Sequence, residues 1–336
     1  MDVALLFAVV LAVGFAITNG LHDASNAIAT LVATRAATPL QGIVLASVFN
    51  LLGPLLLGAA VADTIGGIVT VSPAAATEVI GSGLAAAIGW NLVTWRLGLP
   101  SSSGHALVGG LVGASLVEGG IHAVHWGGLD GWRPEGVFGT LIALAVSPLA
   151  GALVALLAIR TLRGAARRAT RRWDAPVRAG QWGMSAGLAF SHGANDAQKS
   201  VGVIAALLLA DGRIDTLAAP TWTTLLCGAA LTAGTALGGW RIIRTVGRRI
   251  YRIQATDALA SQAASAGVIF GASLAGAPTS TTQVVASSVV GVGVGRRRWR
   301  HVHWAVVRQM GIAWLITIPA TAALAVATLG LWRLLP

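Results

Sequence analysis

Long uncharged apolar stretches alternate with short polar breaks along almost the whole chain. The segments 3–19, 97–117 and 137–159, for example, contain no aspartate, glutamate, lysine or arginine. A helix needs about 20 apolar residues to cross the hydrocarbon core of a bilayer. The pattern predicts crossings over 3–34 (with an interruption), 41–62, 77–95, 100–117, 135–160, 181–209, 218–240, 256–275, 277–295 and 304–330. We therefore expect an all-α integral membrane protein with about ten transmembrane segments, or twelve if half-helices are counted separately.

Composition agrees with this class of protein. Of the 336 residues, 55% are hydrophobic and only 10% are charged, whereas a soluble domain carries about 25% charged residues. The single cysteine, Cys227, cannot form an intramolecular disulfide and excludes cofactor sites built on several cysteines. No nucleotide-binding loop or covalent-catalysis constellation is visible, so we expect no enzymatic activity and no cofactor beyond a coupling ion.

The basic residues cluster between the apolar segments. Seven arginines lie in 160–178, five in 241–252 and four in 296–300. Cytoplasmic loops of membrane proteins carry such an excess of positive charge. The predicted crossings place all three clusters on one side, which we assign to the cytoplasm, and both termini outside. We expect a multi-pass protein of the plasma (inner) membrane. No segment is long enough to form a folded basic domain, so the net charge of +11 does not indicate nucleic-acid binding.

Two polar motifs occur twice in the same order. The segment NGLHDASNA at 19–27 is similar to HGANDAQKS at 192–200, with Asp23 and Asp196 standing 173 positions apart. The segment LPSSSGHALVGGLVG at 99–113 is similar to APTSTTQVVASSVVG at 277–291. A weaker third match pairs Glu78 with Asp257. We infer an internal duplication.

Five crossings per half is an odd number, so the second half enters the membrane from the opposite side. The predicted organisation is a first inverted repeat over 1–160, a basic cytoplasmic linker over 161–180 and a second inverted repeat over 181–336. Many secondary transporters have this architecture, with the substrate site near mid-membrane where broken helices or hairpins of the two halves meet.

Asp23 and Asp196 are the strongest functional candidates, because an ionisable residue within a membrane span is costly and by default marks function. Asn26 lies three positions after Asp23, and Asn195 precedes Asp196. Their carboxylate and amide oxygens suit a small cation or a shared proton, and their amide N–H groups can donate to an oxyanion.

The second motif pair is rich in hydroxyl groups. A proline followed by hydroxyls before an apolar run predicts a helix N-terminus, and exposed N–H groups there bind anions. Two such termini facing each other could surround a tetrahedral oxyanion. The candidates for substrate binding in this pair are Ser102, Ser103, Thr281, Thr282 and Gln283.

Five further residues have open roles. His22 and His105 could contact substrate or relay a proton, or make ordinary helix-face hydrogen bonds. Lys199, the only lysine, could pair with Asp196 at depth or extend to the cytoplasmic surface. Glu78 and Asp257 could be coupling carboxylates or interfacial residues. No metal site is indicated with certainty.

The segments NGLHDASNAIATLVATRAATP, GANDAQKSVGVI and APTSTTQVV resemble the signature segments of the inorganic phosphate transporter (PiT) family. The resemblance covers both halves. It implies an inverted-repeat helical transporter, often a homodimer, that moves inorganic phosphate with a proton or a sodium ion. The family's functional positions fall here on Asp23, Asn26, Asn195 and Asp196, and on Ser102, Ser103, Thr281, Thr282 and Gln283.

The chain departs from the family pattern at two positions. Gly104 replaces a hydroxyl residue, and His22 replaces the asparagine more typical of sodium-coupled members. We predict phosphate import, as the free ion or a metal–phosphate complex, by symport with a proton, with Asp23 and Asp196 holding the coupling ion. A sodium-coupled symporter, a sulfate or other oxyanion permease of the same fold, a channel and an intramembrane enzyme are the alternatives.

Overall fold

Helices make up nearly all of the computed structural model, which describes residues 2–131, 133–165, 173–238 and 245–334. The α-helices are α1 (Val3–Ala33), α2 (Pro39–Leu56), α3 (Ala60–Gly66), α4 (Pro73–Leu97), α5 (Ser103–Gly119), α6 (Gly136–Ala165), α7 (Asp174–Ala210), α8 (Thr221–Leu237), α10 (Ala255–Leu274), α11 (Thr281–Gly295) and α12 (Trp304–Trp332). Shorter helical turns are η1 (Gly120–Ala123), η4 (Thr245–Arg249) and η5 (Trp299–His301). Strands β1 (Gly128–Asp130) and β2 (Arg133–Glu135) form one antiparallel hairpin.

These helices coincide closely with the apolar stretches of the sequence. Within the described residues, six segments are long and apolar enough to cross a membrane: α1, α2, α4, α5 with η1, α6 and α12. The interruption expected within 3–34 was wrong, because α1 runs unbroken from Val3 to Ala33. Its polar side chains find partners on neighbouring helices, so the backbone hydrogen bonds of α1 need not be broken to satisfy them.

The breaks occur instead between α4 and α5 and between α10 and α11. Gly98 ends α4 in a left-handed conformation (φ 67°), and Gly276 follows α10 with φ 68°; glycine adopts this conformation without strain. Ser102 and Ser280 are the N-caps of α5 and α11. Both hydroxyl-rich segments therefore begin helices, as the sequence predicted.

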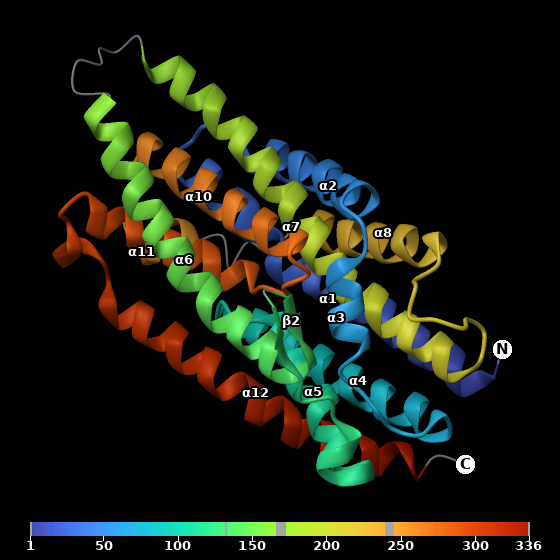
Figure 1. Ribbon diagram of the computed structural model, residues 1–336. Helices are drawn as coiled ribbons and strands as arrows, with labels where there is room; N and C mark the ends of the chain where they lie inside the picture. The colour runs from blue at the N-terminus through green and yellow to red at the C-terminus, as the bar shows by residue number, and fades with distance from the viewer. Residues whose placement is uncertain (1, 132, 166–172, 239–244, 335–336) are drawn as a thin grey trace.

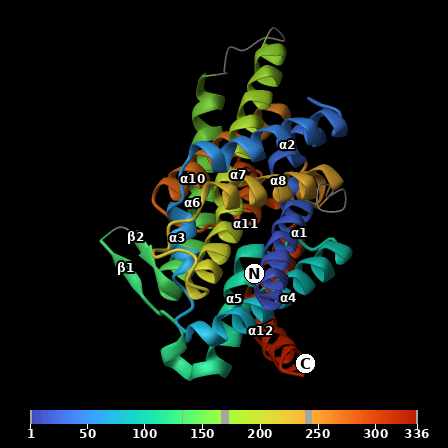
Figure 2. The same ribbon diagram turned by 90° about the vertical axis from the view of Figure 1, so that its right-hand side faces the viewer.

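Helices from the first half of the chain pack against helices from the second half. α6 packs along α11 and α12 along α5, while α1 packs against α8 and α2 against α7. Glycines bring the backbones together at two of these crossings. A Cβ built at Gly20 would lie 2.1 Å from the Leu231 carbonyl oxygen, and one at Gly193 would lie 2.2 Å from that of Asn50. Polar groups on the central helices α1 and α7 are therefore enclosed by elements from both halves (Figures 1 and 2).

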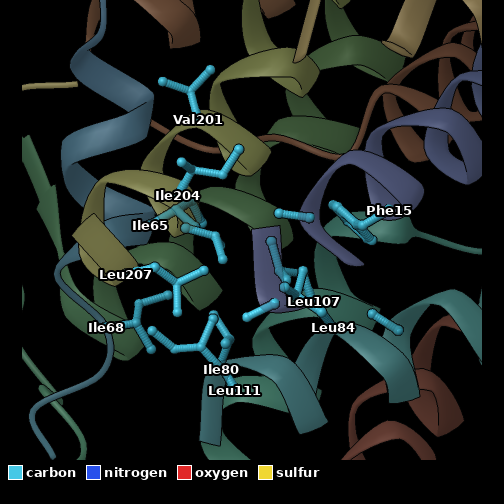
Figure 3. Close-up of a cluster of buried hydrophobic side chains, with 14 of the residues drawn as sticks. Phe15, Ile65, Ile68, Ile80, Leu84, Leu107, Leu111, Val201, Ile204 and Leu207 are labelled. Carbon is cyan, nitrogen blue, oxygen red and sulfur yellow. The ribbon is translucent and has the colours of Figure 1, made fainter. Parts of the chain in front are cut away.

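A large apolar cluster lies beside this centre. It joins buried side chains of α1, α3, α4, α5 and α7, including Phe15, Ile65, Leu84, Leu107 and Ile204 (Figure 3). Large apolar side chains also face outward on α2, α6 and α12, as expected where helices contact lipid tails.

The two ends of the bundle carry different segments. In Figure 1 both chain termini lie at the lower right, whereas the end of α6 and the start of α7 lie at the upper left. α6 continues to Ala165 and α7 begins at Asp174, so both helices extend into the range 161–180 expected as a linker. Residues 166–172, which hold part of the arginine cluster, are outside the described residues.

Candidate functional site

Two aspartates from the middle of α1 and α7 form the centre of the candidate site. Asp23 is 1% exposed and Asp196 is fully buried. The N-termini of α5 and α11 point their hydroxyl groups at these two carboxylates. A buried carboxylate requires such donors, because an unpaired charge at this depth is unstable.

Asp23 accepts hydrogen bonds mainly from neutral groups. Thr282 Oγ1 donates to Oδ1 at 2.5 Å and Ser103 Oγ donates to Oδ2 at 2.9 Å. Asn26 Nδ2 lies 3.2 Å from Oδ1 and also donates to Thr282 Oγ1 at 2.9 Å. His22 Nδ1 is 3.0 Å from Oδ1, and its Nε2 faces Thr94 Oγ1 at 3.2 Å. Asp23 therefore ties α1 to the starts of both α5 and α11.

Asp196 has a charged partner. Lys199 Nζ contacts its Oδ1 and donates to the Thr279 carbonyl oxygen at 2.7 Å. Thr281 Oγ1 donates to Oδ2 at 3.1 Å, and His192 Nε2 lies 2.9 Å from the same oxygen. Lys199 is 1% exposed. Of the two positions considered for this lysine, the structure places it at depth against Asp196.

The two carboxylates and one imidazole converge on a common space. Single ligand atoms of Asp23, His192 and Asp196 lie within 4.8 Å of one another. The starts of α5 and α11 add the positive ends of two helix dipoles. The arrangement offers hydroxyl, amide and ammonium donors to an anion and carboxylate oxygens to a cation or proton, all within one buried cluster.

Four predicted residues lie around this cluster and brace the hairpin turns. Ser102 Oγ accepts from the His105 backbone N–H at 3.2 Å and lies 2.7 Å from His105 Nδ1. Ser280 Oγ accepts from the Gln283 N–H at 3.3 Å, and the Gln283 side chain is buried. Asn195 accepts from the Thr279 N–H and donates to the Ala277 carbonyl oxygen and Ser273 Oγ. It thus holds the segment that enters α11.

Glu78 and Asp257 pair with arginines at helix ends. Glu78 lies 2.9 Å from Arg333 Nη2 beyond the end of α12, and this hydrogen bond raises the pKa of Arg333 above its usual value. Asp257 pairs with Arg296 and accepts from the Gln254 N–H at the start of α10. These contacts fit the interfacial alternative for both acids.

Sequence reasoning missed Asn19 and His192. Ser103 Oγ, which donates to Asp23, also lies 2.8 Å from Asn19 Oδ1. His192 lies beside Asp196, and its Nδ1 is 3.0 Å from Asn50 Oδ1. The signal was present, since these are the first residues of the two matched motifs. Their side chains differ in chemistry between the two motifs.

The sequence profile of the phosphate transporter family matches residues 19–175 and 162–325. The chain belongs to this family. A probable low-affinity inorganic phosphate transporter of Mycobacterium tuberculosis strain H37Rv is 40% identical over 97% of the chain and 77% of that protein. One from Rhizobium meliloti is 38% identical over 96% of both chains. A solved structure of a sodium-dependent phosphate transporter is similar over the full length of both chains, with a TM-score of 0.87 and 26% identity.

Membership of this family establishes the protein's general class and its general role. This phosphate transporter family protein is a multi-pass membrane protein, and its role is transport and not catalysis. The resemblance of its signature segments to those of phosphate carriers is confirmed.

Two cavities of this family member are lined by residues outside the central aspartate cluster. One of about 1050 Å³ is lined by Arg35, Arg178, Arg252, Arg298, His301 and His303. A smaller one of about 280 Å³ is lined by Asp63, His125, Arg133 and Glu135. The first collects one arginine from each of the three clusters that the sequence assigned to the cytoplasmic side.

Proposed function

We propose that the protein imports inorganic phosphate by symport with a proton. The observation that best supports this proposal is that the hydroxyl-rich starts of α5 and α11 converge on Asp23 and Asp196. Asn26, Ser102, Ser103, Asn195, Thr281, Thr282 and Gln283 form the proposed phosphate site or its supporting turns. The two aspartates form the proposed coupling site.

Shared donors would couple the two ligands. Ser103, Thr281 and Thr282 each direct a hydroxyl to a carboxylate. A hydroxyl has one proton to donate, so a phosphate that takes these donors deprives the aspartates of them. The deprived carboxylates then favour a proton or cation, since a buried charge without a partner is costly. Phosphate and its coupling ion would thus bind together more favourably than either alone.

The carboxylates also favour phosphate over sulfate. At neutral pH phosphate retains at least one proton and can donate a hydrogen bond to an ionised aspartate, whereas sulfate has only acceptor oxygens. Before the coupling ion binds, a sulfate beside ionised Asp23 would meet like charge without a compensating hydrogen bond. The same reasoning admits arsenate, which also retains a proton.

We propose that alternating access relies on an inverted duplication with repeats at 1–160 and 181–336. The exchanged packing of α6 on α11 and α12 on α5 supports it, as do the matched pairs Gly20–Gly193 and Ser102–Ser280. The arginine-lined cavity supports a cytoplasmic assignment of that end and outside termini. The proposed state is a homodimer in the plasma membrane, with about ten crossings per subunit. Size-exclusion chromatography with light scattering tests the dimer.

The coupling ion is tested in proteoliposomes with pH and sodium gradients imposed separately. We expect labelled phosphate to accumulate when the outside is acidic, with or without sodium. The similarity to a sodium-dependent phosphate transporter favours sodium as the second candidate. Accumulation that needs a sodium gradient and ignores the pH gradient would replace the proton with sodium. Stimulation by Mg²⁺ at constant phosphate would identify a metal–phosphate complex as substrate.

The site itself is tested with Asp23→Asn and Asp196→Asn. Each substitution keeps the side-chain volume but removes a negative charge, which at Asp23 the coupling ion would neutralise and which at Asp196 faces the ammonium group of Lys199. We expect gradient-driven uptake to be lost in both. Uptake at the wild-type level by either variant would refute the assignment of that aspartate.

A further inference from the structure

The two central aspartates differ in the charge of their surroundings. Asp23 receives its hydrogen bonds from Thr282, Ser103 and Asn26, all neutral groups, with His22 adjacent. Asp196 instead contacts the ammonium group of Lys199, with Thr281 and His192 adjacent. The first carboxylate has no permanently charged partner among the described residues, whereas the second has one.

The difference arises at matched positions of the two motifs. Lys199 stands three residues after Asp196, as Asn26 stands three residues after Asp23. Asn26 donates an amide N–H to Asp23, and Lys199 donates an ammonium N–H to Asp196. One half therefore has an amide at the position where the other half has a full positive charge.

A second difference between the two halves, at Gly104, lies beside this lysine. Gly104 occupies the position in α5 that corresponds to Thr282 in α11, whose hydroxyl serves Asp23. A Cβ built at Gly104 would lie 3.4 Å from Lys199 Nζ. A side chain at position 104 would therefore be in direct contact with the ammonium group.

We propose that Lys199 is a resident cation that takes the place of an exchangeable coupling cation at Asp196. The ammonium group contacts the Asp196 carboxylate and donates a hydrogen bond to the Thr279 carbonyl oxygen, and Lys199 is 1% exposed. A second cation at Asp196 would be repelled by this nearby charge in a medium of low dielectric constant. Only Asp23 is then open to an exchangeable ion, so one fewer cation accompanies each phosphate than in a site with two open carboxylates.

This inference rests on the proposed symport, and its test is the number of cations per phosphate. Lys199→Asn reproduces the Asn26 arrangement at Asp196, and Lys199→Arg is the matched control that keeps the charge. Proteoliposomes are held at zero membrane potential, and phosphate accumulation is measured against imposed pH or sodium gradients. Lys199→Asn is expected to couple one more cation than the wild type, which is about tenfold more accumulation per tenfold cation gradient. Lys199→Arg is expected to keep the wild-type number.

An unchanged cation number in Lys199→Asn would overturn the proposal. If this variant is inactive, cation binding is measured by thermal unfolding in detergent, with sodium chloride replaced by choline chloride in the control and pH varied in parallel. Lys199→Asn is expected to gain a cation-dependent stabilisation that the wild type and Lys199→Arg lack, and equal responses of all three would overturn the proposal. Wild-type proteoliposomes that take up no phosphate would refute the proposed function, but this binding measurement would still decide the role of Lys199.

Discussion

The crossing of α2 and α7 gives a sharp test of how the site is positioned. Gly193 lies three residues before Asp196, and a Cβ added to it would come 2.2 Å from the Asn50 carbonyl oxygen. Ordinary contact begins at 3.4 Å, so Gly193→Ala must push the two helices apart by about 1 Å. The movement would also strain the contact between His192 Nδ1 and Asn50 Oδ1, which are 3.0 Å apart.

The expected loss follows from three terms. Overpacking of a tight contact costs about 1–3 kcal/mol, and loss of the His192–Asn50 hydrogen bond costs about 1 kcal/mol more. Alanine favours the helix over glycine by about 1 kcal/mol. Gly187→Ala on the same helix is the matched control, because a Cβ there meets no atom within 4 Å. It gains the helix term alone, so Gly193→Ala should be less stable than Gly187→Ala by about 2–4 kcal/mol.

Thermal unfolding in detergent and phosphate uptake measure the two consequences. Gly193→Ala should unfold several degrees below Gly187→Ala and should transport more slowly, because Asp196 moves with its helix. Equal unfolding temperatures and equal uptake in the two variants would show that the close approach of α2 and α7 does not position the site.

Three further predictions concern the site and one helix end. Thr282→Val should lose about 2–3 kcal/mol of stability relative to Thr282→Ser, because a hydrogen bond to the charged Asp23 disappears; thermal unfolding and uptake check this, and equal behaviour would contradict the bond. Arsenate should compete with labelled phosphate for uptake while excess sulfate should not, and strong inhibition by sulfate would refute the role of the carboxylates in selection. Arg296→Gln should destabilise the protein by about 3–5 kcal/mol, because it leaves buried Asp257 without its partner, and the double variant with Asp257→Asn should recover most of the loss in thermal unfolding.

Much of the fold was predictable because the membrane imposes a simple rule. Apolar length alone located the helices, since backbone groups in lipid must be paired within a helix. The hairpin turns were also predictable, because Pro100 and Pro278 precede hydroxyl residues that cap helices. The interruption expected in α1 was wrong, because polarity in the sequence does not reveal whether a neighbouring helix supplies the partners. The partners of Asp23 lie up to 259 positions away in the chain.

The site was predictable in composition but not in arrangement. Repetition identified Asp23 and Asp196, and the structure places both in one buried cluster. Spacing named Asp196 as the carboxylate within reach of Lys199, but it left open whether this side chain stays at depth, which the structure shows it does. Asn195 and Asp196 are adjacent in sequence, yet one braces the turn before α11 and the other faces the centre.

The two halves agree where they pack and differ where they carry charge. Gly20 and Gly193 make equivalent close approaches, and Ser102 and Ser280 make equivalent caps. The positions that differ include Asn19 and His192, His22 and Asn195, Asn26 and Lys199, and Gly104 and Thr282. In the proposed alternating-access mechanism, the two halves need similar packing so that neither shape is greatly favoured. It needs no such similarity in its ion sites, because the number of cations that accompany each phosphate depends on which carboxylates stay open. Under the proposed symport, the charge differences between the motifs are therefore the positions where coupling can change without altering the fold.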